Sequence, residues 1–195
     1  MKIKELFNEA LREHKKVING IEAFYPAIEA IASQMSETLG RGNKIMLCGN
    51  GGSAADAQHI ATEFVVRFRG DFNRRSLPAI ALTTDSSLLT ACANDYGFDE
   101  VFKRQVEGLG NEGDLLIGIS TSGNSPNVYK ALEYANEQNI QTILLAGRDG
   151  GKIAEIAKYS VIIPHKDTAR IQEAHITVGH ILCRLTEELI FQINP

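Results

Sequence analysis

Cysteine is scarce in this chain, with three residues among 195. Cys48, Cys92 and Cys183 are odd in number, far apart and set among apolar neighbours, and the sequence has no Cys-x-x-Cys pair. A disulfide framework or a thiolate metal site requires paired or clustered cysteines. We therefore interpret the three cysteines as reduced thiols of the core.

Blocks of basic residues and long apolar runs are also missing. The formal net charge is −4, which gives no electrostatic support for a nucleic-acid groove or an anionic membrane surface. No apolar run approaches the roughly eighteen residues of a membrane span, and the charged first 16 residues lack the apolar segment of a signal peptide. We expect a cytoplasmic protein without nucleic-acid or membrane partners, with residues 1–195 forming one domain.

A strand, a glycine turn and a helix are predicted between Lys44 and Phe68. The apolar run 45–48 is typical of a strand buried on both faces of a parallel sheet. The turn 49–53, Gly-Asn-Gly-Gly-Ser, lets the backbone approach a ligand, and the helix start that follows suits a phosphate or sugar oxygens. Because the turn is neither a complete Gly-x-Gly-x-x-Gly nor a Walker loop, we expect no nucleotide.

Two reactive side chains lie on this first helix. His59 and Glu63 are four residues apart and so project from one face. They would place an imidazole and a carboxylate near the same ligand. Taken alone, the segment is equally consistent with a tight turn followed by a surface ion pair.

The same architecture recurs about seventy residues later. A strand is predicted over 114–119, and the loop Ser120-Thr121-Ser122-Gly123-Asn124-Ser125 follows it at once. Pro126 suits a first helical position behind Ser125 as N-cap. Hydroxyl groups beside a helix N-terminus predict a phosphate site that needs no lysine.

Strands and helices alternate along the whole core. Further strands are predicted over 77–82, 141–146 and 160–164, behind two N-terminal helices within 1–42, the second of them from about residue 21 to residue 39. Further helices are predicted over 98–109 and 152–157. This alternation predicts an α/β fold, a doubly wound parallel sheet flanked by helices over 43–195, with ligands at the carboxyl ends of the strands. Both polar loops belong to that edge.

The last predicted helix, from about Thr168 to Phe191, carries Gln172 and His180. They are eight residues apart, about 12 Å along a helix axis, so coordination of one ion by both from a single chain is awkward. If both serve one site, we expect them from different subunits. The same arrangement would let Glu63 and His180 reach one site from different chains.

The assembled motifs resemble the sugar isomerase (SIS) domain and, within it, the phosphoheptose isomerase family. They are CGNGGSAADAQH with Glu63 after it, ALTTD, NDYGF, GISTSGNSPNV, GRDGGK, and ARIQEAH with His180 after it. The resemblance implies a flavodoxin-like fold and a homotetramer with active sites at subunit interfaces. It also implies interconversion of sedoheptulose 7-phosphate and D-glycero-D-manno-heptose 7-phosphate through an enediol, for bacterial surface heptose in lipopolysaccharide core or capsule.

The resemblance also implies the roles of individual residues. Glu63 would be the catalytic base and His180 the proton donor. One zinc ion per subunit would be bound by His59, Glu63, Gln172 and His180. The substrate would contact Asn50, Gly51, Gly52, Ser53, Glu63, Asn94, Asp95, Ser120, Thr121, Ser122, Ser125 and Gln172.

The chain departs from the family pattern in two places. Val65-Val66 stand before Arg67 where many relatives have Thr-Gly, and Ala169 stands where some have aspartate, so no acid role is transferred there. Of the other arginines near loop 70–76, we interpret Arg69, Arg74 and Arg75 as solvated surface residues.

Two other functions remain open at this point. One is a non-catalytic SIS scaffold that binds the replication initiator, and the other is an SIS isomerase of another sugar phosphate. Glu63 and His180 favour the enzyme over the scaffold, and the NDYGF and RIQE segments favour heptose.

Overall fold

The computed structural model describes residues 2–192. Five parallel strands form one sheet in the order β2-β1-β3-β4-β5, as in flavodoxin-like doubly wound folds. They are β1 (Ile45–Gly49), β2 (Ala79–Ala81), β3 (Leu115–Ser120), β4 (Gln141–Gly147) and β5 (Tyr159–Ile163). The predicted fold class is confirmed.

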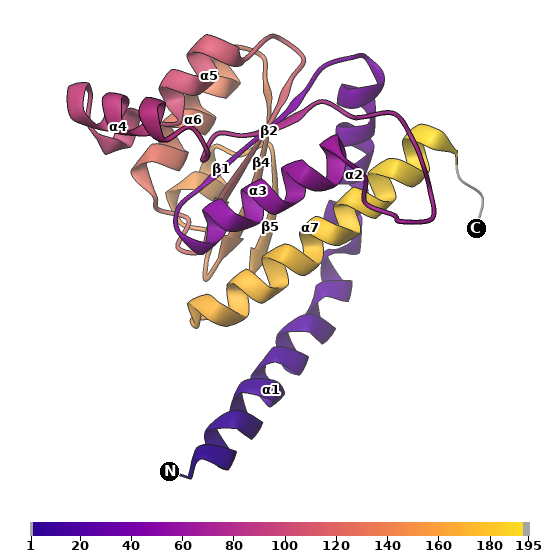
Figure 1. The fold of residues 1–195 in the computed structure, drawn as a ribbon. Coiled ribbons are helices and arrows are strands. Elements are labelled where there is room, and N and C mark those ends of the chain that lie inside the picture. Colours follow the sequence, from indigo (N-terminus) through magenta and orange to yellow (C-terminus); the bar gives the residue numbers. More distant parts are fainter. Residues whose placement is uncertain (1, 193–195) are drawn as a thin grey trace.

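Helices cover both faces of the sheet (Figure 1). One face carries α2 (Tyr25–Gly40), α3 (Gly52–Val65) and α7 (Thr168–Phe191). The other carries α4 (Ser86–Asp95), α5 (Lys103–Leu109) and α6 (Pro126–Glu137). The chain therefore has two apolar layers, one on each side of the strands.

Successive strand residues belong alternately to these two layers. Leu47 and Ile117 pack with α2, α3 and α7, whereas Met46 and Leu116 pack with α5 and α6. Burial on both faces explains the unbroken apolar runs of the strands. The three cysteines are free and buried, as predicted.

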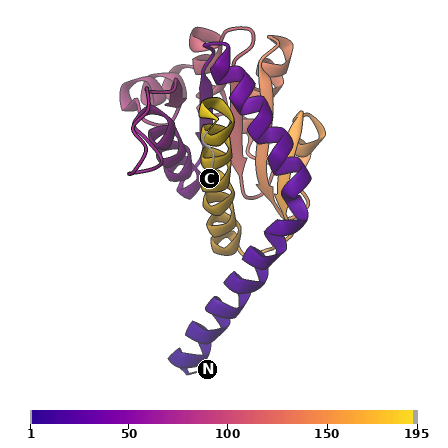
Figure 2. The ribbon, with the colours of Figure 1, turned by 90° about the vertical axis from the view of Figure 1, so that its right-hand side faces the viewer.

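The two predicted N-terminal helices are present, with a shifted boundary. Helix α1 (Ile3–Asn19) is joined to α2 by a 3-10 turn, Gly20–Phe24. The second helix starts at Tyr25 rather than near residue 21, because Pro26 lacks an N–H and fits the first helical turn. Helix α1 projects away from the body of the molecule (Figure 2).

Two other predicted helices are shorter than expected. The segment 98–109 contains a 3-10 turn, Phe98–Glu100, ahead of α5, and the segment after the Gly147–Gly151 turn forms only a 3-10 turn, Lys152–Glu155. Within residues 2–192, no helix combines the length and hydropathy needed to cross a membrane.

Candidate active site

The loops after β1 and β3 lie side by side at the carboxyl edge of the sheet. The two strands pair as far as Gly49 and Ile119, after which the chain turns into α3 on one face and α6 on the other. The side-chain amides of Asn50 and Asn127 donate to each other's oxygens, both at 2.9 Å. A crevice at such a switch in strand order is the usual ligand site of doubly wound folds. Asn127 is not among the residues predicted from sequence.

The loop after β3 is organised by its own hydroxyl groups. The Oγ atoms of Ser120 and Ser125 lie 2.9 Å apart, and Ser122 Oγ accepts from the backbone N–H of Asn124 at 3.1 Å. Ser125 occupies the predicted N-cap position of α6, but its side chain makes no capping bond. Because Ser120 engages that hydroxyl instead, Ser125 does not cap the first turn of α6, which suits an anion there.

Gly123 packs this loop against the loop after β4. It has a φ of +66°, and a Cβ atom there would lie 1.9 Å from the carbonyl oxygen of Gly150. Gly123→Ala should therefore displace the hydroxyl groups and raise KM for a phosphorylated substrate roughly tenfold or more. Gly108→Ala, with no atom within 4 Å of the added Cβ, is the control in the same steady-state assay. An unchanged KM for Gly123→Ala would contradict a phosphate role for the loop.

Helices α3 and α7 run side by side from the ligand edge of the sheet (Figure 1). Near their N-termini, a Cβ atom on Gly52 would lie 2.4 Å from Nε2 of Gln172. Further along, a Cβ atom on Gly179 would lie 2.6 Å from Cδ1 of Ile60. From the first contact to the second the chain advances eight residues along α3 and seven along α7, so the two helices run parallel. Glycine on each side permits their close approach.

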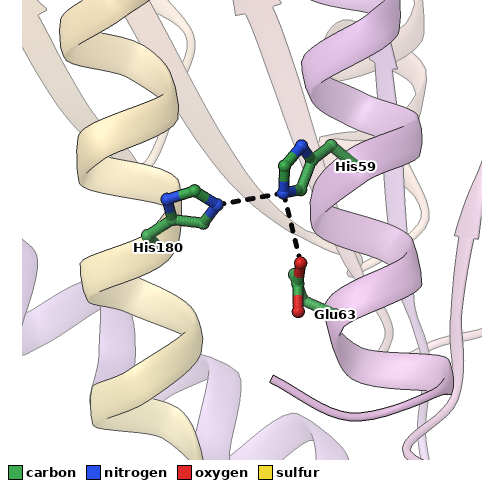
Figure 3. Close-up of side chains that lie close together, drawn as sticks. All are labelled: His59, Glu63 and His180. Carbon is green, nitrogen blue, oxygen red and sulfur yellow. Dashed lines mark hydrogen bonds and ion pairs between the residues drawn. The ribbon is translucent and has the colours of Figure 1, made fainter. Parts of the chain in front are cut away.

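His59, Glu63 and His180 converge across these two helices (Figure 3). Nε2 of His59 lies 3.1 Å from Oε1 of Glu63 and 3.0 Å from Nε2 of His180. One ligand atom from each residue lies within 4.8 Å of the others. His59 is exposed, and Glu63 and His180 are half-buried, so solvent and small ligands reach the cluster.

The three side chains fit a zinc ion. Two imidazoles and a carboxylate are a familiar zinc donor set, and tetrahedral bonds of about 2.0–2.1 Å place neighbouring ligand atoms roughly 3.3 Å apart. The two contacts of His59, at 3.0 and 3.1 Å, are close to that spacing, and the ligand atoms of Glu63 and His180 lie within 4.8 Å of each other. A fourth position would remain for another protein ligand, water or substrate.

Gln172 lies at the other end of this helix pair. Its amide contacts Gly52, and its distance from His180 along α7 is about 12 Å by helix geometry. Coordination of one ion by both residues of one chain is therefore awkward, as the sequence spacing predicted. For Glu63 and His180 the structure differs from the sequence expectation, because α3 and α7 of the same chain already bring them together.

The remaining predicted substrate residues fall into two groups. Ser53 is buried in the first turn of α3 behind Gly51, which has a φ of +57°. Asn94 and Asp95 are exposed at the end of α4, where the Asn94 amide donates to the Asp95 carboxylate at 2.8 Å. Among residues 2–192, no hydrogen bond joins this pair to the other predicted site residues.

Asp56 adds a carboxyl group between the glycine turn and the cluster. Its Oδ2 atom is buried and has no hydrogen-bond partner among the described residues. Burial raises the pKa of Asp56 to about 6, although nearby His59 opposes the shift. Such a group changes protonation state close to neutral pH. Asp56 is not among the site residues predicted from sequence.

His175 attaches α7 to the sheet and makes the fold sensitive to acid. Its Nε2 donates to the carbonyl oxygen of Ala146 at 2.9 Å, and burial lowers its pKa from 6.5 to about 4. Between pH 6.5 and pH 4 the imidazole binds a proton in the unfolded chain but not in the folded chain. The free energy of unfolding is therefore highest above pH 6.5 and decreases as the pH falls toward 4.

Urea unfolding should therefore show a loss of about 2 kcal/mol from His175 alone between pH 7 and pH 5. His175→Gln has no titrating ring, so its free energy of unfolding should fall by correspondingly less over this interval. Equal losses in the two proteins would contradict a neutral buried imidazole.

Comparison with known proteins agrees with this geometry. A model of the SIS domain matches residues 9–147. The phosphoheptose isomerase of Geotalea daltonii is 52% identical over 96% of this chain and 97% of its own length. That of Aquifex aeolicus is 52% identical over 97% of this chain and 96% of its own length.

Solved structures agree as well. The phosphoheptose isomerase from Neisseria gonorrhoeae superposes with a TM-score of 0.88 at 45% identity, covering 96% of this chain and 100% of that one. The enzyme from Francisella tularensis gives a TM-score of 0.91 at 35% identity, with the same coverage of both chains. The resemblance read from the motifs is confirmed: the chain belongs to the SIS domain family and, within it, to the phosphoheptose isomerases.

Proposed function

We propose that this protein interconverts sedoheptulose 7-phosphate and D-glycero-D-manno-heptose 7-phosphate. The observation that carries the proposal is the convergence of His59, Glu63 and His180 on a fold whose neighbouring loop is rich in hydroxyl groups. Full-length similarity to phosphoheptose isomerases supports the same reaction. The product would supply heptose for a bacterial surface glycan, in lipopolysaccharide core or capsule.

The reaction moves two protons between neighbouring carbons and oxygens. Starting from the ketose, a base removes a proton from C1 while the C2 carbonyl oxygen gains one, giving the enediol. A proton then returns to C2 as the C1 hydroxyl loses its own, giving the aldehyde. Glu63 is the proposed base at carbon, and His180 is the proposed donor to oxygen. Ser120, Thr121, Ser122 and Ser125 would hold the phosphate away from the reacting carbons.

A zinc ion is the proposed cofactor, one per subunit. His59, Glu63 and His180 of one chain would bind it, with Gln172 of another subunit as fourth ligand. When bound, zinc would polarise the carbonyl oxygen. A carboxylate held tightly by a metal is a poor base, so Glu63 would need to release the ion, or share it loosely, when it removes the proton.

A homotetramer is the proposed assembly, and α1 supports self-association. None of its residues is buried. Four of them are large apolar residues that are exposed to solvent: Ile3, Leu6, Phe7 and Leu11. These residues recur at three- and four-residue spacing, so they form one apolar stripe. A stripe of this kind usually packs against another helix. Light scattering on the purified chain would measure the assembly.

The experiment that tests the function is direct. Purified protein is incubated with sedoheptulose 7-phosphate, and the aldose is followed by NMR after chelation and after zinc is restored. We expect turnover that falls on chelation and returns with zinc. A folded tetramer without turnover under any metal condition would favour another sugar phosphate or the scaffold role.

A further inference from the structure

Arg74 is buried, in contrast to the surface position expected from sequence. Its side chain is only 1% exposed, as is that of Glu187 in α7. Arg74 Nε donates to Oε1 of Glu187 at 2.6 Å. A fully buried ion pair is expensive to desolvate and is therefore weak support for a role in stability alone.

The same guanidinium group binds the end of α3. Its Nη2 donates to the carbonyl oxygen of Glu63 at 2.7 Å, and its Nη1 donates to that of Phe64 at 2.8 Å. The last carbonyl groups of a helix lack partners within the helix, and a cation there is favourable. Arg74 therefore binds the backbone of Glu63 itself as well as α7.

The ion pair also connects the two helices that carry the cluster. Glu187 lies two turns beyond His180 on α7, and its Oε1 also accepts from the backbone N–H of Phe68 at 3.4 Å. Its Oε2 is buried without a partner in the described part of the chain. The planar guanidinium group of Arg74 donates to Glu187 of α7 and to the last carbonyl groups of α3 at the same time.

We propose that Arg74, held by Glu187, is a positioning residue that orients Glu63 toward His59 and His180. The inference rests on the proposed role of Glu63 in the reaction and in zinc binding. Arg74 acts only through the Glu63 backbone and the spacing of α3 and α7. Its loss should weaken metal binding and turnover more than it weakens binding of the sugar phosphate, because loop 120–125 is held by other contacts.

Arg74→Lys tests the proposal, since lysine keeps the charge but lacks the directed donor groups. We expect zinc affinity, measured by competition with a coloured chelator, to fall roughly 10- to 100-fold, as for other residues that orient ligands. The kcat should fall by a similar factor while KM changes less than about twofold. Should Arg74→Lys fail to fold, Glu187→Gln removes the pair from the other side.

Asp114→Asn is the control for general destabilisation. Asp114 is also buried, and it accepts from the backbone N–H groups of Lys44 and Asn111 at 2.9 and 2.8 Å, at the amino end of the sheet. The control should lose thermal stability and keep its zinc affinity and kcat. Equal losses in the control, or normal values in folded Arg74→Lys, would overturn the proposal.

Glu63→Gln separates this inference from the proposed function. An active Glu63→Gln would remove the proposed role of Glu63, whatever Arg74 does. An inactive Glu63→Gln beside a fully active, zinc-binding Arg74→Lys would refute the positioning role alone.

Discussion

Glu63→Gln should isomerise sedoheptulose 7-phosphate at roughly one-thousandth of the wild-type rate or less. General acid–base groups typically contribute about 10²–10⁴-fold, and the amide can neither remove a proton from carbon nor act as an anionic zinc ligand. The carboxylate is half-buried beside His59, so the nearly isosteric amide should leave the fold intact. The rate is measured by NMR at saturating substrate, with light scattering to verify the assembly.

Glu37→Gln is the matched control for this substitution. This substitution makes the same chemical change on α2, where the exposed Glu37 carboxylate pairs with exposed Arg41 at 3.4 Å. It should retain wild-type kcat. Activity near wild type in Glu63→Gln would remove Glu63 from the mechanism and leave His180 or Asp56 to supply the base.

Mixed assemblies of Glu63→Gln and Gln172→Ala should regain about a quarter of wild-type activity, although each variant alone is inactive or nearly so. In a two-fold symmetric interface each chain contributes the same residues to the site of its partner. A mixed pair then contains one intact site, made of the cluster from the Gln172→Ala chain and the Gln172 of the other chain. Random association at equal amounts makes about half of all pairs mixed, and removing the assemblies that carry a single tag raises this share only slightly in a tetramer.

Glu63→Gln mixed with His180→Ala is the matched negative case. Since Glu63 and His180 converge within one chain, every site in such a mixture lacks one of them, and activity should stay at background. Both mixtures are prepared by co-expression with two different tags, and only assemblies carrying both are assayed. Recovery in the second mixture would place Glu63 and His180 in different chains. No recovery in the first would remove Gln172 from a shared site.

Local sequence determined the strands, the two ligand loops and most helix starts. A strand buried on both faces must be apolar throughout, which marked β1, β3 and β4. Pro126 could enter a helix only in its first turn, which marked the start of α6. The common face of His59 and Glu63 followed from their four-residue spacing on α3, and the family motifs indicated the chemistry.

Only the tertiary structure decided which of these groups meet. Residue spacing specifies a helix face but not the helix packed against it, so the approach of His180 to His59 depended on the parallel packing of α3 and α7. The burial of Arg74 had no local signal either, because its partners are Glu187 in α7 and the backbone of Glu63 in α3. The sequence by itself thus determined the elements and their reactive groups. The long-range packing of helices on the sheet determined the geometry in which those groups act.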